Sequence, residues 1–79
     1  MNEFEILKRV IAEVLNVDKD EITKDTTFID DLGADSLDVF QIIMGVEEKL
    51  NIEVDTEAAE KLSTVGDAVE LIKKTVANK

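Results

Sequence analysis

The residues best placed to do chemistry lie in the segment Leu32-Gly33-Ala34-Asp35-Ser36-Leu37-Asp38, where a serine hydroxyl stands between two carboxylates. Gly33 permits a tight turn, and an apolar helical run follows. We therefore expect Ser36 at the start of a helix with its hydroxyl facing outward. The simplest interpretation is that this hydroxyl caps the helix, as most serines before an apolar run do. The spacing alone favours the cap.

Other kinds of chemistry are limited by what the chain lacks. It contains no Cys and no His, which excludes disulfides, thiolate nucleophiles, catalytic triads and zinc sites. An EF-hand calcium loop starting at Asp18 fails, because Ile22 stands where a ligand is needed and Thr23 where glycine is needed. Carboxylate pairs are plentiful, but so small a helical domain has little room to enclose a substrate. We expect neither a metal site nor an enzyme.

Acidic residues dominate the charge and are unevenly distributed. The chain has nineteen Asp and Glu against nine Lys and Arg, a net charge of −10 and an isoelectric point near 4.2. Such a chain repels nucleic acid and anionic membranes. Residues 30–60 hold ten of the acids but a single base, Lys49. Solubility is one interpretation; the concentration in one segment favours a docking surface for basic partner proteins.

Size and hydropathy indicate a small protein of the cell interior. The 79 residues, 8.8 kDa in all, allow one domain spanning residues 1–79. The acidic N-terminus lacks the positive charge of a targeting peptide. The longest apolar stretch, residues 39–46, includes Gln41 and is far shorter than a membrane span. We expect a soluble, cytoplasmic monomer.

The first half of the chain predicts one long helix followed by a long loop. Apolar residues recur at helical spacing over about residues 3–15, and Asn16 is a plausible end because Asn tolerates the left-handed conformation. Residues 16–35 have no sustained period, apart from a short helical turn expected near Asp20. Apolar anchors are expected to pin this loop over the helices; they are Val17, Ile22, Phe28, Ile29 and Leu32.

A second long helix is predicted from Asp35 or Ser36 to about Leu50, and Asp35 is a good N-cap for it. The apolar residues of this helix form two stripes, which is more than one buried face needs. The second stripe consists of Leu37, Phe40 and Met44. Either that stripe widens the core face or it contacts a partner protein, and the pattern leaves both interpretations open.

The last third of the chain predicts a loop over residues 51–55 and a short helix at about residues 57–61, capped by Thr56. A final long helix begins after Thr64, with Asp67 in the capping-box position. Three long helices and a short one joined by loops predict an all-α fold. We expect a small antiparallel four-helix bundle with three long helices, one short helix and a long first loop.

The motif Gly33-Ala34-Asp35-Ser36-Leu37-Asp38 resembles the phosphopantetheine attachment site of acyl carrier proteins. The resemblance covers essentially the whole chain. It includes Phe28 before Asp30-Asp31-Leu32, the run Glu47-Glu48-Lys49 and the segment Thr64-Val65-Gly66-Asp67-Ala68-Val69, in order and spacing. It implies a four-helix bundle with a covalent phosphopantetheine arm on Ser36. The arm ends in a thiol that holds acyl groups as thioesters, so Ser36 is implied to be an attachment point and the reactions belong to partner enzymes.

The resemblance implies two further sets of residues. One set docks partners, namely the phosphopantetheinyl transferase (holo-acyl-carrier-protein synthase) and fatty acid synthesis enzymes, through their basic patches. Its members are Asp35, Leu37, Asp38, Met44, Glu47 and Glu48. The other set lines a cavity for the acyl chain and consists of Ile43, Val46, Leu62, Ala68 and Ile72.

Three positions depart from the pattern of the family it resembles. Neutral Gln41, beside the bulky Phe40, stands where Glu is usual. Gly45 replaces a common Ala, which is expected to loosen the helix by up to ~1 kcal/mol. Asp55 stands where Pro is usual. These departures bear on partner choice and admit a specialised carrier beside a housekeeping one.

The resemblance predicts a carrier of acyl intermediates in dissociated (type II) fatty acid biosynthesis. Other cargoes stay open, such as polyketide or D-alanyl units, although the motif favours fatty acid or polyketide carriers over aminoacyl ones. A rival of another class is an unmodified acidic interaction module, in which Ser36 is only a helix cap.

Overall fold

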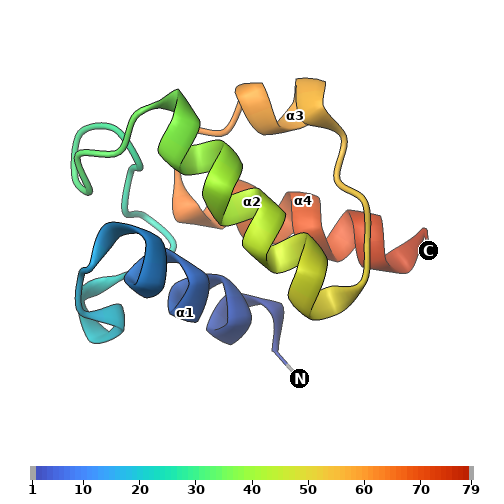
Figure 1. Cartoon of the computed structure of the whole chain (residues 1–79), viewed down its shortest axis with the longest axis horizontal. Helices are drawn as coiled ribbons and strands as arrows, with labels where there is room; N and C mark the ends of the chain where they lie inside the picture. Colours follow the sequence, from blue (N-terminus) through green and yellow to red (C-terminus); the bar gives the residue numbers. More distant parts are fainter. Residues whose placement is uncertain (1, 79) are drawn as a thin grey trace.

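Helices and the loops between them make up the chain in the computed structural model, which describes residues 2–78 (Figure 1). The elements are α1 (Glu3–Leu15), the 3₁₀ turn η1 (Lys19–Glu21), α2 (Ser36–Leu50), α3 (Thr56–Glu60) and α4 (Val65–Ala77). Within the described residues the β-structure is an isolated antiparallel bridge between Thr27 and Thr64. The predicted all-α bundle, with three long helices and one short one, is confirmed. None of the helices described is long and apolar enough to cross a membrane.

Local capping fixes the ends of the long helices where the sequence predicts them. Asn16 follows α1 in the left-handed conformation with φ of 57°. At the start of α4 the Thr64 hydroxyl accepts the N–H of Asp67 at 3.1 Å, and the Asp67 carboxylate accepts the N–H of Thr64 at 3.2 Å. These reciprocal bonds satisfy amide groups that would otherwise lack partners at a helix start.

The short helix α3 begins one residue earlier than predicted. Its N-cap is Asp55, whose carboxylate accepts the N–H of Glu57 at 3.0 Å, so Thr56 is the first helical residue and the prediction of Thr56 as the cap was wrong. A carboxylate is at least as good an N-cap as a threonine hydroxyl. The capping bond also gives Asp55 a structural role at a position that departs from the expected Pro.

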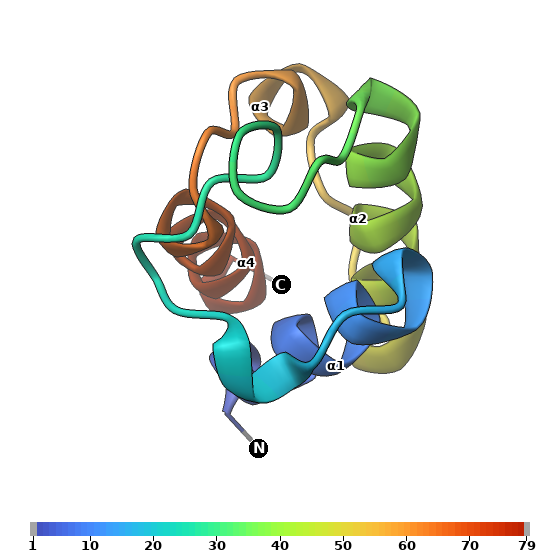
Figure 2. The same cartoon turned by 90° about the vertical axis from the view of Figure 1, so that its left-hand side faces the viewer.

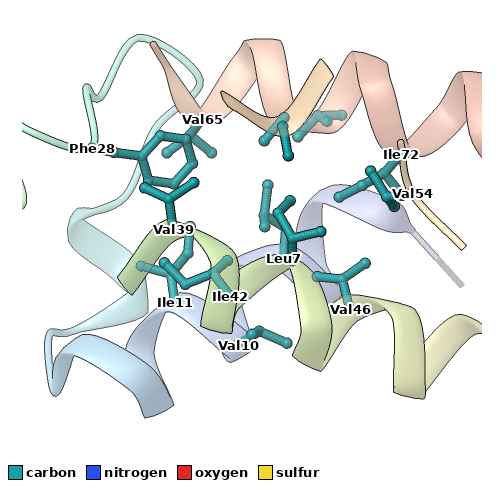
Figure 3. Close-up of a cluster of buried hydrophobic side chains, with 14 of the residues drawn as sticks. Leu7, Val10, Ile11, Phe28, Val39, Ile42, Val46, Val54, Val65 and Ile72 are labelled. Carbon is teal, nitrogen blue, oxygen red and sulfur yellow. The ribbon is translucent and has the colours of Figure 1, made fainter. Parts of the chain in front are cut away.

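A single apolar core joins the helices to the long first loop. Its largest fully buried side chain is Phe28, which comes from the loop and lies in the same cluster as Val39 and Val65 (Figure 3). Ile11 and Ile42, from α1 and α2, are fully enclosed in that cluster. The buried side chains of the described residues are all apolar. The loop is therefore an integral part of the core, as the predicted anchor Phe28 required.

Backbone hydrogen bonds fasten the loop to the start of α4 (Figure 2). The N–H of Val65 donates to the carbonyl of Thr26 at 2.8 Å, and the N–H of Gly66 donates to the carbonyl of Lys24 at 2.8 Å. A Cβ atom on Gly66 would lie 2.9 Å from that same carbonyl oxygen, so glycine is what permits the approach. Because the loop leads directly into α2, these bonds help to fix where α2 begins.

Gly45 lies where α2 crosses α1. A Cβ atom built at Gly45 would come within 2.8 Å of the Val10 Cγ1 atom, closer than carbon atoms pack. The glycine therefore lets the two helices approach, which is a physical reason for a residue that lowers helix propensity. Figure 3 shows Val10 on the α1 side of the core, near α2.

Candidate functional site

Ser36 is the first residue of α2 and its side chain is exposed. The helix cap is Asp35, whose carboxylate accepts the N–H of Asp38 at 2.9 Å, while the Asp38 carboxylate accepts the N–H of Asp35 at 3.3 Å. Within residues 2–78 no hydrogen bond involves the Ser36 hydroxyl. The interpretation of Ser36 as the cap is therefore wrong, because Asp35 occupies that role and leaves the hydroxyl free.

The start of α2 favours an anionic group beside Ser36. The N–H groups of Ser36 and Leu37 are the first two of the helix and have no acceptor inside it. Such amides and the helix dipole together attract phosphate. The neighbouring carboxylates of Asp35 and Asp38 each accept the other's backbone N–H, and their negative charges oppose an anion locally.

Two pockets open between α2 and α3. The serine-side pocket has a volume of about 300 Å³, and it is lined by Ile29, Ser36, Val39, Phe40, Ala59, Glu60 and Leu62. The far pocket has a volume of about 280 Å³, and it is lined by Phe40, Ile43, Met44, Glu47, Val54, Thr56 and Ala59. An apolar chain carried close to Ser36 would find both pockets along one side of α2.

The residues predicted to line an acyl cavity fall into two groups. Leu62 lines the serine-side pocket and Ile43 the far pocket. Val46, Ala68 and Ile72 are instead fully buried in the central core, with no exposed surface. The resemblance implied one cavity lined by all five, and it did not separate pocket walls from core. Phe40 and Ala59, which line both pockets, were missed as cavity residues.

The predicted docking residues of α2 are mostly on the surface. Leu37 is 65% exposed and Met44 59% exposed, so these two members of the second apolar stripe face outward, whereas its third member, Phe40, is half-buried and packs against the core. Asp35 and Glu48 are exposed, and Asp38 is half-buried. Ile29 adds a third exposed apolar side chain at 56%, which corrects its prediction as a loop anchor. The neighbouring Phe28 fills the core, and the turn after it directs Ile29 outward.

Glu47 differs from the other predicted docking residues because its carboxylate is engaged inside the protein. Its Oε2 atom accepts the N–H of Val54 at 2.7 Å, across seven residues of sequence. Val54 is buried, and Glu47 is half-buried. The bond therefore ties the loop between α2 and α3 to the end of α2, at the edge of the far pocket. Glu48, the next residue, is exposed on α2.

Comparison with known proteins identifies the relatives of this chain. Residues 5–72 match the protein family described as "Phosphopantetheine attachment site". An acyl carrier protein of Clostridium perfringens (strain 13) is 56% identical over 69 residues, which are 87% of this chain and 91% of that protein. An acyl carrier protein of Helicobacter pylori (strain J99) is 55% identical over 69 residues, or 87% of this chain and 88% of that one.

Solved structures share the fold. A putative acyl carrier protein from Mycobacterium tuberculosis superimposes with a TM-score of 0.78 at 33% identity, covering 96% of each chain. An acyl carrier protein from Thermotoga maritima gives a TM-score of 0.81 at 22% identity, with 99% of this chain and 94% of that chain covered. The second likeness concerns the fold alone.

The start of α2 fits the prosthetic group of this family. A phosphopantetheine group needs a hydroxyl that is exposed and free of internal bonds, and Ser36 supplies one. It also needs room for a phosphodiester, and the first amides of α2 would lie beside it. With the family match, the close relatives and this fit together, the chain belongs to the acyl carrier protein family, whose cofactor is phosphopantetheine.

Proposed function

We propose that Ser36 carries the phosphopantetheine arm and that residues 1–79 act as one carrier domain for acyl intermediates in dissociated fatty acid synthesis. The observation that carries the proposal is the exposed Ser36 hydroxyl at the first position of α2, with the cap supplied by Asp35. The bound arm supplies a thiol on which acyl groups are held as thioesters. The chain itself has no Cys and offers no such group, so its own role is to bear and present the cargo while partner enzymes catalyse the reactions.

Each part of the site has a defined task in this proposal. Ser36 provides the oxygen through which the phosphate is attached. The amides of Ser36 and Leu37 favour the phosphate charge at the helix start. Asp35 and Asp38 hold the first turn of α2 in place, so that the hydroxyl stays exposed to the transferase.

The attachment is tested by intact mass after incubation with a phosphopantetheinyl transferase and coenzyme A. The wild-type protein should gain one phosphopantetheine unit, and Ser36→Ala should gain none. Ser63→Ala is the matched control, because Ser63 is the other serine of the chain and is also exposed just before a helix. That variant should be modified like the wild type. Modification of Ser36→Ala at another residue, or none of the wild type, would contradict the proposal.

Ser36→Ala should also leave the fold intact, since the cap of α2 is Asp35. A surface substitution of this kind changes the free energy of unfolding by about 0.5 kcal/mol or less. Urea unfolding of the unmodified proteins measures this. A much larger loss would mean that the serine has a structural role after all.

The cargo is proposed to be fatty acyl. The motif around Ser36 favours fatty acid or polyketide units over D-alanyl units, and the relatives are named acyl carrier proteins. A reconstituted set of dissociated fatty acid synthesis enzymes provides the test. The modified protein should support elongation of a short primer to a long saturated chain. If the modified protein does not support elongation but is loaded by a D-alanyl ligase, its cargo is aminoacyl and not fatty acyl.

Partner enzymes are proposed to dock on the acidic and apolar surface of α2 through basic patches. The exposed Leu37 and Met44 supply apolar contacts, and the exposed Glu48 supplies charge. Glu48→Lys should slow association with the transferase more than Glu13→Lys, an equivalent reversal at an exposed position of α1. The difference should shrink as salt rises, because charges are screened beyond about 8 Å at physiological ionic strength. Equal effects of both reversals in stopped-flow association would remove the case for this surface.

A further inference from the structure

The serine-side pocket and the far pocket are neighbours that share the same two residues, Phe40 and Ala59. Phe40 comes from α2 and Ala59 from α3. Their volumes are nearly equal, at about 300 and 280 Å³. Together they would form one longer apolar space along α2 if nothing stood between them.

Of the two shared residues, Phe40 has the bulk to separate the pockets. Ala59 is 2% exposed and contributes only a methyl group to the boundary. The Phe40 side chain is half-buried, with a ring that is large in relation to either pocket. Phe28 differs in its burial, because the core encloses that ring fully and leaves it no room to move. A half-buried ring can rotate toward solvent without opening the core.

We propose that the Phe40 side chain is a partition that sets the length of acyl chain this protein encloses. A short chain occupies one pocket with Phe40 in place, whereas a longer chain is enclosed only when the ring moves aside and joins the two pockets. The inference rests on the proposed attachment of the arm to Ser36. It assigns to Phe40 the part of a residue that determines specificity for cargo length.

The partition predicts a characteristic dependence of stability on chain length. Each further methylene group that is buried raises the folding equilibrium constant about fourfold. In the wild-type protein this increase should stop, or pause, at the length that fills one pocket. When the ring is removed, the increase should continue until both pockets are filled. Because the pocket volumes are nearly equal, the chain length at the plateau should rise by up to about twofold.

The experiment loads saturated acyl groups from butyryl to palmitoyl onto the wild type, Phe40→Ala, Phe40→Leu and Leu15→Ala, using a transferase and the acyl-coenzyme A series. Intact mass confirms loading, and the midpoint of urea unfolding is compared with that of the unmodified form of each variant. Phe40→Leu keeps apolar bulk in case Phe40→Ala is too unstable to study. Leu15→Ala is the matched control, because it removes a half-buried apolar side chain that lies on α1 and lines neither pocket.

Phe40→Ala should move the plateau to longer chains, Phe40→Leu should move it less, and Leu15→Ala should leave it unchanged. If the proteins load but the wild-type and Phe40 profiles coincide, or if Leu15→Ala shifts the plateau equally, the partition is overturned while the carrier function stands. If no variant loads, the proposed attachment itself fails.

A second measurement uses only the wild-type protein. Methyl resonances of Leu62 report the serine-side pocket and those of Ile43 the far pocket. As the acyl chain lengthens, one of these should respond first, and the other should respond together with the Phe40 ring at a greater length. Simultaneous response of both methyl groups to the shortest bound chain, with the Phe40 ring unaffected, would overturn the proposal.

Discussion

Helix α2 has two sides that are packed in opposite ways. Toward α1 the packing leaves no spare volume: Ile42 and Val46 are fully buried, and a single Cβ atom at Gly45 would collide with Val10. Toward α3 the same helix borders two pockets, and Met44 is 59% exposed. A carrier that must keep its attachment site fixed while it accepts different cargo benefits from this division, because a close-packed contact resists change and a loosely filled one does not.

The two sides also differ in how they are held together. The contact of α2 with α1 consists of apolar side chains, such as Ile11 and Ile42, in the central cluster. Near α3, one identified polar tie is the bond from the Val54 N–H to the Glu47 carboxylate at 2.7 Å. Hydrophobic contacts over a continuous surface are lost together, whereas a single hydrogen bond can open locally. We therefore expect the α3 side to yield first.

The largest effect should come from the close-packed side. Ile42→Ala removes a fully buried side chain and should lower the free energy of unfolding by about 2–5 kcal/mol. Met44→Ala, two residues further along α2 but exposed, should lower it by about 0.5 kcal/mol or less. Urea unfolding of both variants measures the contrast. Similar losses at the two positions would mean that the two sides of α2 do not differ as described.

Removing the polar tie should have the next largest effect. Glu47→Ala leaves the Val54 N–H without its acceptor, at a cost of about 1–3 kcal/mol. Hydrogen exchange of the Val54 amide should become faster, together with that of α3. Glu48→Ala, at the adjacent exposed position, should change neither quantity. An unchanged exchange rate at Val54 in Glu47→Ala would show that the loop is held by other contacts.

Gly45→Ala sharpens the comparison from the α1 side. The alanine gains about 1 kcal/mol of helix propensity, but its Cβ atom meets Val10, and overpacking costs about 1–3 kcal/mol. The net result should be a small loss of up to ~2 kcal/mol. In a Val10→Ala background the same change should become stabilising, because the space is then available. A double-mutant cycle by urea unfolding tests the sign change. If Gly45→Ala changes the free energy of unfolding in the same direction in both backgrounds, the contact with Val10 is not what makes glycine necessary at position 45.

Electrostatic repulsion should have the smallest effect and should act on the α3 side. Residues 30–60 hold ten acids and one base, and α3 with its cap contributes Asp55, Glu57 and Glu60. At pH 7 the melting temperature should rise on adding NaCl, and rise further with millimolar Mg²⁺ or Ca²⁺ at equal ionic strength, since exposed charges are worth about 1 kcal/mol or less each. At low salt, amides of residues 55–62 should exchange before those of α1. A melting temperature that does not change with salt, or exchange of α1 amides before those of residues 55–62, would show that charge repulsion does not limit the stability of the fold.

The sequence by itself determined the features that depend on neighbours along the chain. The ends of α1 and α4 follow from Asn16 and from the pair Thr64 and Asp67, because capping acts within one helical turn. The motif around Ser36 and its match to carrier proteins located the candidate attachment site. The all-α fold followed from helical periodicity, which repeats every few residues and is visible in one dimension.

Only the tertiary structure decided what depends on the distance between elements. It turned Ile29 outward and placed Gly45 against Val10. Neither outcome can be read from periodicity, because each depends on how the loop and the helices pack against one another.

The pockets and the tie that borders them are likewise tertiary features. The bond between Glu47 and Val54 spans a chain reversal, and the boundary between Phe40 and Ala59 joins two helices. The apolar pattern places Val46 in the core stripe of α2 and Phe40 in the second stripe, and it leaves the orientation of that second stripe open. The crossing of α2 with its neighbours makes Phe40 a pocket wall and leaves Val46 fully buried in the core, because packing geometry, unlike periodicity, is set by contacts between segments distant in the sequence.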